Sequence, residues 1–113
     1  MAKARQAAGS IHATTKGAKG AHHAVYVILL YDQRRSEPWG LYVGQTSRDP
    51  DLRFDQHKAG YKASGAAKRF GIRLLPPLFE HLNPMKGWEA LEIEAGLAAE
   101  FVRAGVPWVE GGH

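Results

Sequence analysis

The chain contains no cysteine and no apolar run long enough to cross a bilayer. The lack of cysteine excludes disulfide bonds and thiolate metal sites. The lack of a membrane span, or of the apolar segment of a signal peptide, favours a cytoplasmic protein with no membrane partner. The 113 residues suffice for one domain with a modest core. The sequence therefore predicts a single cytoplasmic domain that is held together by apolar packing.

Negative charge is missing from the first part of the chain, because no Asp or Glu precedes Asp32. The basic residues there stand among Ala, Gly, Ser and Thr, which bury too little apolar surface to offset their conformational entropy. We therefore expect residues 1–23 to form a disordered basic tail and residues 24–113 to form the folded domain. The formal net charge of +4 favours a polyanionic partner, most simply nucleic acid.

Two apolar runs that each carry a tyrosine predict the centre of the fold. Residues 25–31 are β-branched, leucine or aromatic, and residues 41–43 repeat this chemistry after a polar loop. We expect an antiparallel pair of strands with Tyr26 and Tyr42 on one face. Gly44 closes the second strand and lets another backbone or a ligand come close. Strand tyrosines are more often packing residues than catalytic ones, so both roles stay open.

A short helix is predicted after these strands. Asp49 provides the N-cap with proline next to it, and Gly60 is the natural stop, so residues 50–59 form the helix. Arg53 and His57 then lie side by side on one helical face. A solvated basic face would explain this pattern as well as a binding site does. The basic residues that we expect to contact nucleic acid here are Lys58, Lys62, Lys68 and Arg69.

Proline constrains the next part of the chain. Ser64 is expected to cap a second short helix that ends near Phe70. Two prolines separate the apolar runs 72–75 and 78–82. Because proline cannot donate to a sheet, the third strand is expected at a sheet edge, or after the prolines.

Residues 86–104 predict a long helix, with a start signal at Asn83 and a stop at Gly105. On a helical wheel Glu89 falls on the charged face, whereas Glu94 falls opposite, among apolar side chains. An ionised carboxylate is costly there unless it is paired or binds a metal. Two alternatives therefore remain: Glu94 pairs with an arginine, or it is a metal ligand.

This order of elements resembles the GIY-YIG nuclease domain. The first triplet reads Ala24-Val25-Tyr26 and the second Tyr42-Val43-Gly44, followed by the Arg-x3-His helix and by EALEIEAGLAAEF around Glu94. The resemblance covers residues 24–109. It implies an α/β (α+β) fold in which helices flank a three-stranded antiparallel sheet, and it implies hydrolysis of DNA phosphodiester bonds with Mg²⁺ or Mn²⁺.

The resemblance also implies roles for individual residues. Arg53 would brace a phosphate through its planar guanidinium. A tyrosine hydroxyl would position or deprotonate the attacking water, and which of Tyr26, Tyr42 and His57 is the general base stays open. Carried over by position, the implied site residues are Tyr26, Tyr42, Gly44, Arg53, His57 and the metal ligand Glu94.

The chain departs from this pattern near its C-terminal end. The family usually has an asparagine soon after the glutamate helix, whereas residues 107–112 contain none and Glu110 stands nearest. A second function therefore stays open, that of a non-catalytic nucleic-acid-binding module with the same fold. The domain carries no appended DNA-reading motif, so specificity is expected from DNA shape, a partner protein or self-association.

Overall fold

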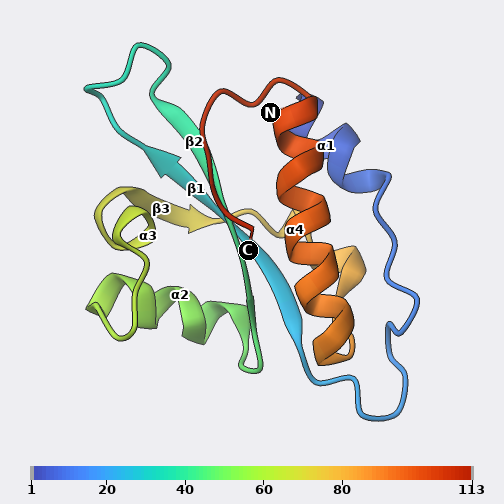
Figure 1. The fold of residues 1–113 in the computed structure, drawn as a ribbon. Coiled ribbons are helices and arrows are strands. Elements are labelled where there is room, and N and C mark those ends of the chain that lie inside the picture. Colours follow the sequence, from blue (N-terminus) through green and yellow to red (C-terminus); the bar gives the residue numbers. More distant parts are fainter. Residues whose placement is uncertain (1, 113) are drawn as a thin grey trace.

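A computed structural model describes residues 2–112, and its centre is a four-stranded sheet in the order β3-β1-β2-β4 (Figure 1). β1 (Ala24–Tyr31) pairs antiparallel with β2 (Trp39–Thr46) and with β3 (Gly71–Leu74). β4 (Val109–Gly111) pairs parallel with β2. The mixed α/β class agrees with the sequence prediction. The prediction of three antiparallel strands is wrong, because the last residues add a fourth, parallel strand.

The fourth strand is too short to produce a periodic sequence pattern. It is held at the edge of β2 by close backbone contact, since the N–H of Gly112 donates to the Val43 carbonyl at 3.1 Å. Gly111 has a φ of 78°, and a Cβ there would overlap the same carbonyl. A pair of glycines therefore lets the chain pass this close to β2 and cover its free edge.

Helices cover both sides of the β1–β2 ribbon (Figure 1). α2 (Pro50–Ala59) and α3 (Gly65–Phe70) lie on one side, and α1 (Ala2–Gly9) and α4 (Gly87–Arg103) lie on the other. Burial from both sides explains why β1 is an unbroken apolar run instead of an alternation of polar and apolar residues.

The two short helices begin and end where their capping residues predict. The Asp49 carboxylate accepts the Asp51 N–H at 2.8 Å, and Gly60 ends α2 in the left-handed region at φ 90°. The Ser64 hydroxyl accepts the Ala67 N–H at 3.3 Å and so caps α3. These caps fix the loop between α2 and α3, which borders the candidate site.

The prolines divide the chain after β3 as expected. β3 is an edge strand and ends before Pro76. The apolar run 78–82 does not continue as a strand; it contributes to two 3₁₀ turns, η1 (Pro76–Leu78) and η2 (Glu80–Leu82). In these turns Leu78 and Leu82 are buried, which accounts for the apolar sequence without a strand.

α4 begins at Gly87, later than the start signal at Asn83 predicts. The Asn83 side chain is engaged elsewhere, because it accepts the Val25 N–H at 2.9 Å and donates to the Val25 carbonyl at 2.8 Å. It therefore extends the hydrogen bonding of β1 and does not cap a helix. None of the helices within residues 2–112 is both long enough and apolar enough to cross a membrane.

Residues 2–23 are packed against the domain, which corrects the expectation of a disordered tail. α1 buries Ala4 and Ala8, and the Ala8 carbonyl lies 3.0 Å from Nε2 of His81. The Lys16 ammonium donates to the His81 carbonyl at 2.8 Å. Small side chains allow this close docking, although a composition rich in alanine buries little apolar area by itself.

The strongest anchor of this segment is Glu89 of α4, which the helical wheel places on the charged face but which is only 5% exposed. Thr14 and Thr15 each donate a backbone N–H and a hydroxyl to its carboxylate, at 2.6–2.7 Å. Burial raises the pKa of Glu89, but these hydrogen bonds outweigh it and lower the pKa to about 2. The N-terminal segment therefore both covers this carboxylate and supplies its hydrogen-bond donors.

Candidate active site

Tyr26 and Tyr42 stand next to each other on one face of the β1–β2 pair, as the sequence predicts. In the register Tyr26 faces Gly44, and Tyr42 lies two residues before Gly44 on the same face. The centroids of the two phenol rings are 6.2 Å apart. A Cβ at Gly44 would overlap the hydroxyl and ring of Tyr26. The close approach that Gly44 permits is therefore that of the Tyr26 side chain.

His57 of α2 completes a cluster of three rings with these tyrosines. Its ring centroid lies 6.0 Å from that of Tyr26 and 5.4 Å from that of Tyr42. Its Nε2 lies 2.8 Å from the Tyr26 hydroxyl, and both side chains are buried. His57 follows Arg53 by one helical turn, so α2 directs both residues toward the cluster.

The hydrogen bonds of His57 define its tautomer. The backbone N–H of Ser64 donates to Nδ1 at 3.2 Å. Because an N–H can only donate, Nδ1 carries the lone pair and the neutral ring holds its proton on Nε2. Nε2–H therefore donates to the Tyr26 hydroxyl, and the proton of Tyr26 is left to be donated to another group. Sequence reasoning assigned Ser64 only a capping role and missed this contact.

Burial shifts the pKa values of all three rings toward their neutral forms. It lowers the pKa of His57 to about 4, and the positive charge of Arg53 adds to this effect. It raises the pKa of Tyr26, as does Tyr42, whereas Arg53 opposes the shift. Near neutral pH His57 is therefore uncharged and donates only through Nε2–H.

Tyr42 interacts with both Tyr26 and Glu94. Burial raises its pKa, and so does the negative charge of Glu94. Hydrogen bonding by Tyr26 and Ser64 lowers it, as does the charge of Arg53. A hydroxyl that donates to the Tyr42 oxygen lowers the pKa of Tyr42, because it stabilises the phenolate. This direction agrees with Tyr26, whose proton points away from His57. Tyr42 is also less buried than Tyr26, so water reaches it more easily.

Arg53 braces the loop after α2. Its guanidinium donates to the carbonyls of Tyr61 at 3.1 Å and Lys62 at 2.8 Å, and to the Gln56 side chain at 3.3 Å. These contacts use three of the five N–H donors of a guanidinium, and Arg53 also hydrogen-bonds the side chain of Tyr26. The same loop leads to Ser64, so Arg53 also helps to hold His57 in place.

Glu94 projects from α4 into the interior and is only 6% exposed, as the helical wheel predicts. The charge of Glu94 raises the pKa of Tyr42, so the carboxylate interacts with the same cluster. Among residues 2–112, no group of three or more His, Asp and Glu side chains is arranged to hold a metal ion. A cation at this site would therefore depend on Glu94 as its carboxylate ligand.

The four basic residues that were expected to contact nucleic acid differ in their surroundings. The Lys58 ammonium donates to the carbonyls of Lys68 at 2.8 Å and Gly71 at 2.9 Å, so it stabilises the end of α3. Lys62, Lys68 and Arg69 are exposed. The Arg69 guanidinium lies 5.3 Å from the ring centroid of Phe70.

The position nearest to the expected asparagine is also occupied by an engaged side chain. The Glu110 carboxylate accepts the indole N–H of Trp108 at 2.8 Å. Glu110 is the register partner of Tyr42, and the next residue, Gly111, lies against β2. The C-terminal strand therefore borders the ring cluster, a placement that its three residues do not reveal in the sequence.

Comparisons with protein-family models, with curated proteins and with solved structures find no match to this chain. Its function therefore has to be inferred from the chemistry of the site, because the fold alone does not define an activity.

Proposed function

We propose that this protein is a metal-dependent endonuclease that hydrolyses DNA phosphodiester bonds, with a site of the GIY-YIG type. The observation that carries the proposal is the ring cluster of Tyr26, Tyr42 and His57, which lies beside Arg53 and near Glu94. Three elements supply these residues: the β1–β2 hairpin, α2 and α4. Packing alone does not require an arginine and a glutamate beside a cluster of three rings.

The hydrogen-bond direction favours Tyr42 as the proton acceptor, with Tyr26 as its partner. Both nitrogens of His57 are engaged, so this ring cannot take a proton from water in this arrangement. Tyr26 can donate its own proton toward Tyr42 while Nε2–H of His57 supports its oxygen. Once Tyr42 has released its own proton to solvent, the tyrosinate would orient the attacking water and take a proton from it. Its raised pKa means that a nearby positive charge must assist.

Arg53 would supply part of that charge. A remaining N–H donor can bind a non-bridging phosphate oxygen, and its positive charge already lowers the pKa of both tyrosines. Since two of its donors hold the loop and a third bonds the Gln56 side chain of α2, the guanidinium is fixed before the substrate arrives. Such preorganisation stabilises the charge that develops on the phosphoryl oxygens in the transition state.

The residues fit a divalent cation in one form, a hydrated ion with a single protein carboxylate. Mg²⁺ commonly keeps several waters and binds through one or two carboxylates together with substrate phosphates. Glu94 is the residue that would hold it, because it is the buried carboxylate whose charge reaches the ring cluster. When bound, Mg²⁺ or Mn²⁺ would neutralise charge on the phosphate and on the leaving oxygen.

The alternative is a non-catalytic module that binds nucleic acid through the basic residues beyond α2. Two observations favour it: burial raises the pKa of both tyrosines, and residues 2–112 offer no cluster of several metal ligands. In either case the proposed partner is DNA and the proposed location is the cytoplasm. Target choice would depend on DNA shape, a partner protein or self-association.

Nicking of supercoiled plasmid, with and without Mg²⁺ or Mn²⁺, separates the two functions. We expect metal-dependent nicking by the unmodified protein. Tyr26→Phe keeps the ring and removes the hydroxyl, so we expect a rate loss of roughly 10²-fold with DNA binding retained. A protein that binds the plasmid but never nicks it is the non-catalytic module. Nicking that survives Tyr26→Phe unchanged would make Tyr26 a packing residue.

A further inference from the structure

We propose that the end of the sheet away from the candidate site is a second DNA contact, which stacks unpaired bases of a single strand on Tyr31 and Trp39. These two residues are register partners in the last pair of the β1–β2 ladder. Their ring centroids are 4.5 Å apart with the planes tilted by 56°, and they are 36% and 47% exposed. Exposed aromatic rings stack on bases of any sequence, because every base has a π-face.

Positive charge flanks these rings on the same face of the sheet. Arg73 of β3 pairs with Leu29, and Leu29 shares a sheet face with Tyr31, two residues further on. Arg5 of α1 lines the same groove as Leu29 and Arg73. We call the surface formed by Tyr31, Trp39, Leu29, Arg73 and Arg5 the hairpin platform.

The charges of the hairpin platform are available to a ligand. Asp32 pairs with Arg34 and Glu100 pairs with Arg103, and neither of these ion pairs involves Arg5 or Arg73. None of the described residues that line the groove between these two arginines is acidic. Exposed rings bind bases, and guanidinium groups beside them bind phosphates. A surface that offers both therefore favours a nucleic acid as its partner over a protein.

A second hollow next to Tyr31 contains two further arginines together with Asp32. It is lined by Tyr31, Arg34, Arg69 and Phe70, among others. The guanidinium groups of Arg34 and Arg69 lie 5.6 and 5.3 Å from the ring centroid of Phe70. Arg34 is partly neutralised by Asp32 at 3.0 Å, so Arg69 is the stronger candidate for a phosphate contact. A strand could thus meet positive charge in both hollows as it passes the two rings.

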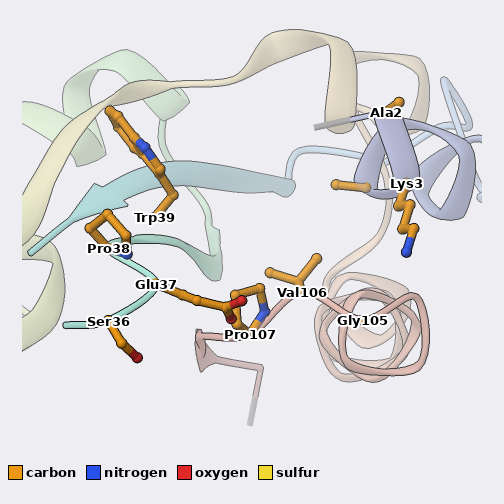
Figure 2. A pocket seen from close by; sticks show the side chains of 10 residues that line it. Ala2, Lys3, Ser36, Glu37, Pro38, Trp39, Gly105, Val106 and Pro107 are labelled. Carbon is orange, nitrogen blue, oxygen red and sulfur yellow. The ribbon is translucent and has the colours of Figure 1, made fainter.

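Trp39 also forms a wall of the groove between the hairpin and α1, as Figure 2 shows. Pro38 and Glu37 lie beside it, and Ala2 and Lys3 of α1 line the opposite part of the groove. The hairpin platform therefore opens toward solvent at Trp39, and the packing of α1 does not cover it.

The hairpin platform lies apart from the candidate active site. Tyr26 and Tyr31 belong to the same strand but face opposite sides of the sheet, about 16 Å apart at the usual rise per residue. A duplex at the candidate site could send an unpaired tail around the end of the hairpin. Any effect of the hairpin platform on cleavage rests on the proposed function. Its binding of single-stranded DNA does not.

Fluorescence anisotropy with a labelled oligothymidylate tests the binding surface without any cleavage. We expect Trp39→Ala to weaken binding roughly 5- to 100-fold, the loss typical of one stacked base, and Trp39→Phe to weaken it less. Trp88→Ala is the matched control, because Trp88 is 55% exposed on α4, outside the platform. Arg5→Ala and Arg73→Ala should each reduce the salt dependence by about 0.7 in slope.

Two results would overturn the inference. The first is that Trp39→Ala binds oligothymidylate as tightly as the unmodified protein does, and the second is that Trp88→Ala loses as much affinity as Trp39→Ala. Binding of a blunt duplex should change little in Trp39→Ala, and an equal loss there would show a general contact instead. If the protein never nicks plasmid but binds oligothymidylate through Trp39, the proposed function fails and the platform stands. If it nicks plasmid and Trp39→Ala changes neither binding nor the preference for tailed duplexes, the platform fails alone.

Discussion

The Tyr26 hydroxyl lies 2.8 Å from Nε2 of His57, and the other ring nitrogen accepts the backbone N–H of Ser64 at 3.2 Å. The histidine is thus held neutral between a fixed donor and a hydroxyl, in a buried position. A protonated ring would have to break the contact with Ser64, because both nitrogens would then be donors.

This relationship predicts how stability depends on pH. The pKa of His57 falls from 6.5 to about 4 in the folded state. The unfolded chain therefore binds a proton more readily in this range, so stability that is present above pH 6.5 should be lost as the pH falls toward 4. Melting temperatures from pH 7 to 4 should fall less steeply for His57→Gln than for the unmodified protein. The exposed His22→Gln should keep the original slope; a matching change there would mean that His57 is not responsible.

Gly44→Ala should damage the site through Tyr26. The added Cβ would overlap the hydroxyl and ring of Tyr26, so the ring must move and lose its contact with His57. We expect destabilisation of about 1–3 kcal/mol, typical of overpacking, together with loss of nicking. Gly96→Ala is the control, because a Cβ on this part of α4 meets nothing within 4 Å and should stabilise the helix by about 0.5–1 kcal/mol. Equal melting temperatures for the two variants would contradict the steric argument.

Glu94→Gln should separate stability from activity. Neutralising a buried carboxylate removes a desolvation cost, so we expect an unchanged or higher melting temperature. Nicking should disappear, together with any stabilisation by added Mg²⁺. The pKa of Tyr42 should fall, because the charge of Glu94 raises it. Glu92→Gln on the exposed face of α4 should change none of these.

Two results would reject this assignment of Glu94. An unfolded Glu94→Gln variant would indicate a structural ion-pair partner, whose loss typically costs about 3–5 kcal/mol. A variant that still nicks plasmid would place the centre of the site elsewhere.

Removing residues 2–19 should lower the melting temperature strongly. The deletion exposes the surface that covers Ala4 and Ala8 and leaves the Glu89 carboxylate without its four hydrogen bonds from Thr14 and Thr15. We expect a loss of at least about 3 kcal/mol, since hydrogen bonds to charged groups contribute about 1.5–3 kcal/mol each and are not fully additive. A deletion that melts like the full chain would show that the segment is not docked.

The pKa of Glu89 provides a second check of the same contact. Because it is lowered from 4.5 to about 2, its stabilisation is present above pH 4.5 and should be lost as the pH falls through 2. Glu89→Gln should remove this acid dependence and lower stability, since the amide NH₂ would replace one carboxylate oxygen and face the two donors of one threonine. Hydrogen exchange of residues 2–16 should accelerate in the variant and stay slow in Glu92→Gln.

Substitution of Lys58 should affect stability, whereas substitution of Lys62 should affect DNA binding. Lys58 donates to two backbone carbonyls at the end of α3, so Lys58→Ala should cost about 1 kcal/mol of stability. Its effect on the salt dependence of DNA binding should be small. Lys62 is exposed, so Lys62→Ala should leave the melting temperature unchanged and reduce the salt slope by about 0.9. Binding that does not respond to salt at all would contradict the proposal of a phosphate-binding face.

Local features of the sequence determined the elements around the candidate site. The β-branched and aromatic runs predict the β1–β2 hairpin, and the capping residues Asp49, Gly60 and Ser64 predict α2 and α3. These signals act over a few residues, so they are readable without knowledge of the rest of the chain. The apolar surroundings of Glu94 follow from the helical period for the same reason.

Tertiary structure decided what surrounds those elements. Glu89 looks like a surface residue on a helical wheel, and only the docking of the N-terminal segment buries it and supplies its donors. The parallel strand β4, the tautomer of His57 and the engagement of Lys58 likewise depend on partners that are distant in sequence or set by a loop. Sequence periodicity describes which side of an element is apolar, but a hydrogen bond depends on which group arrives at that side. That information exists only once the chain is folded.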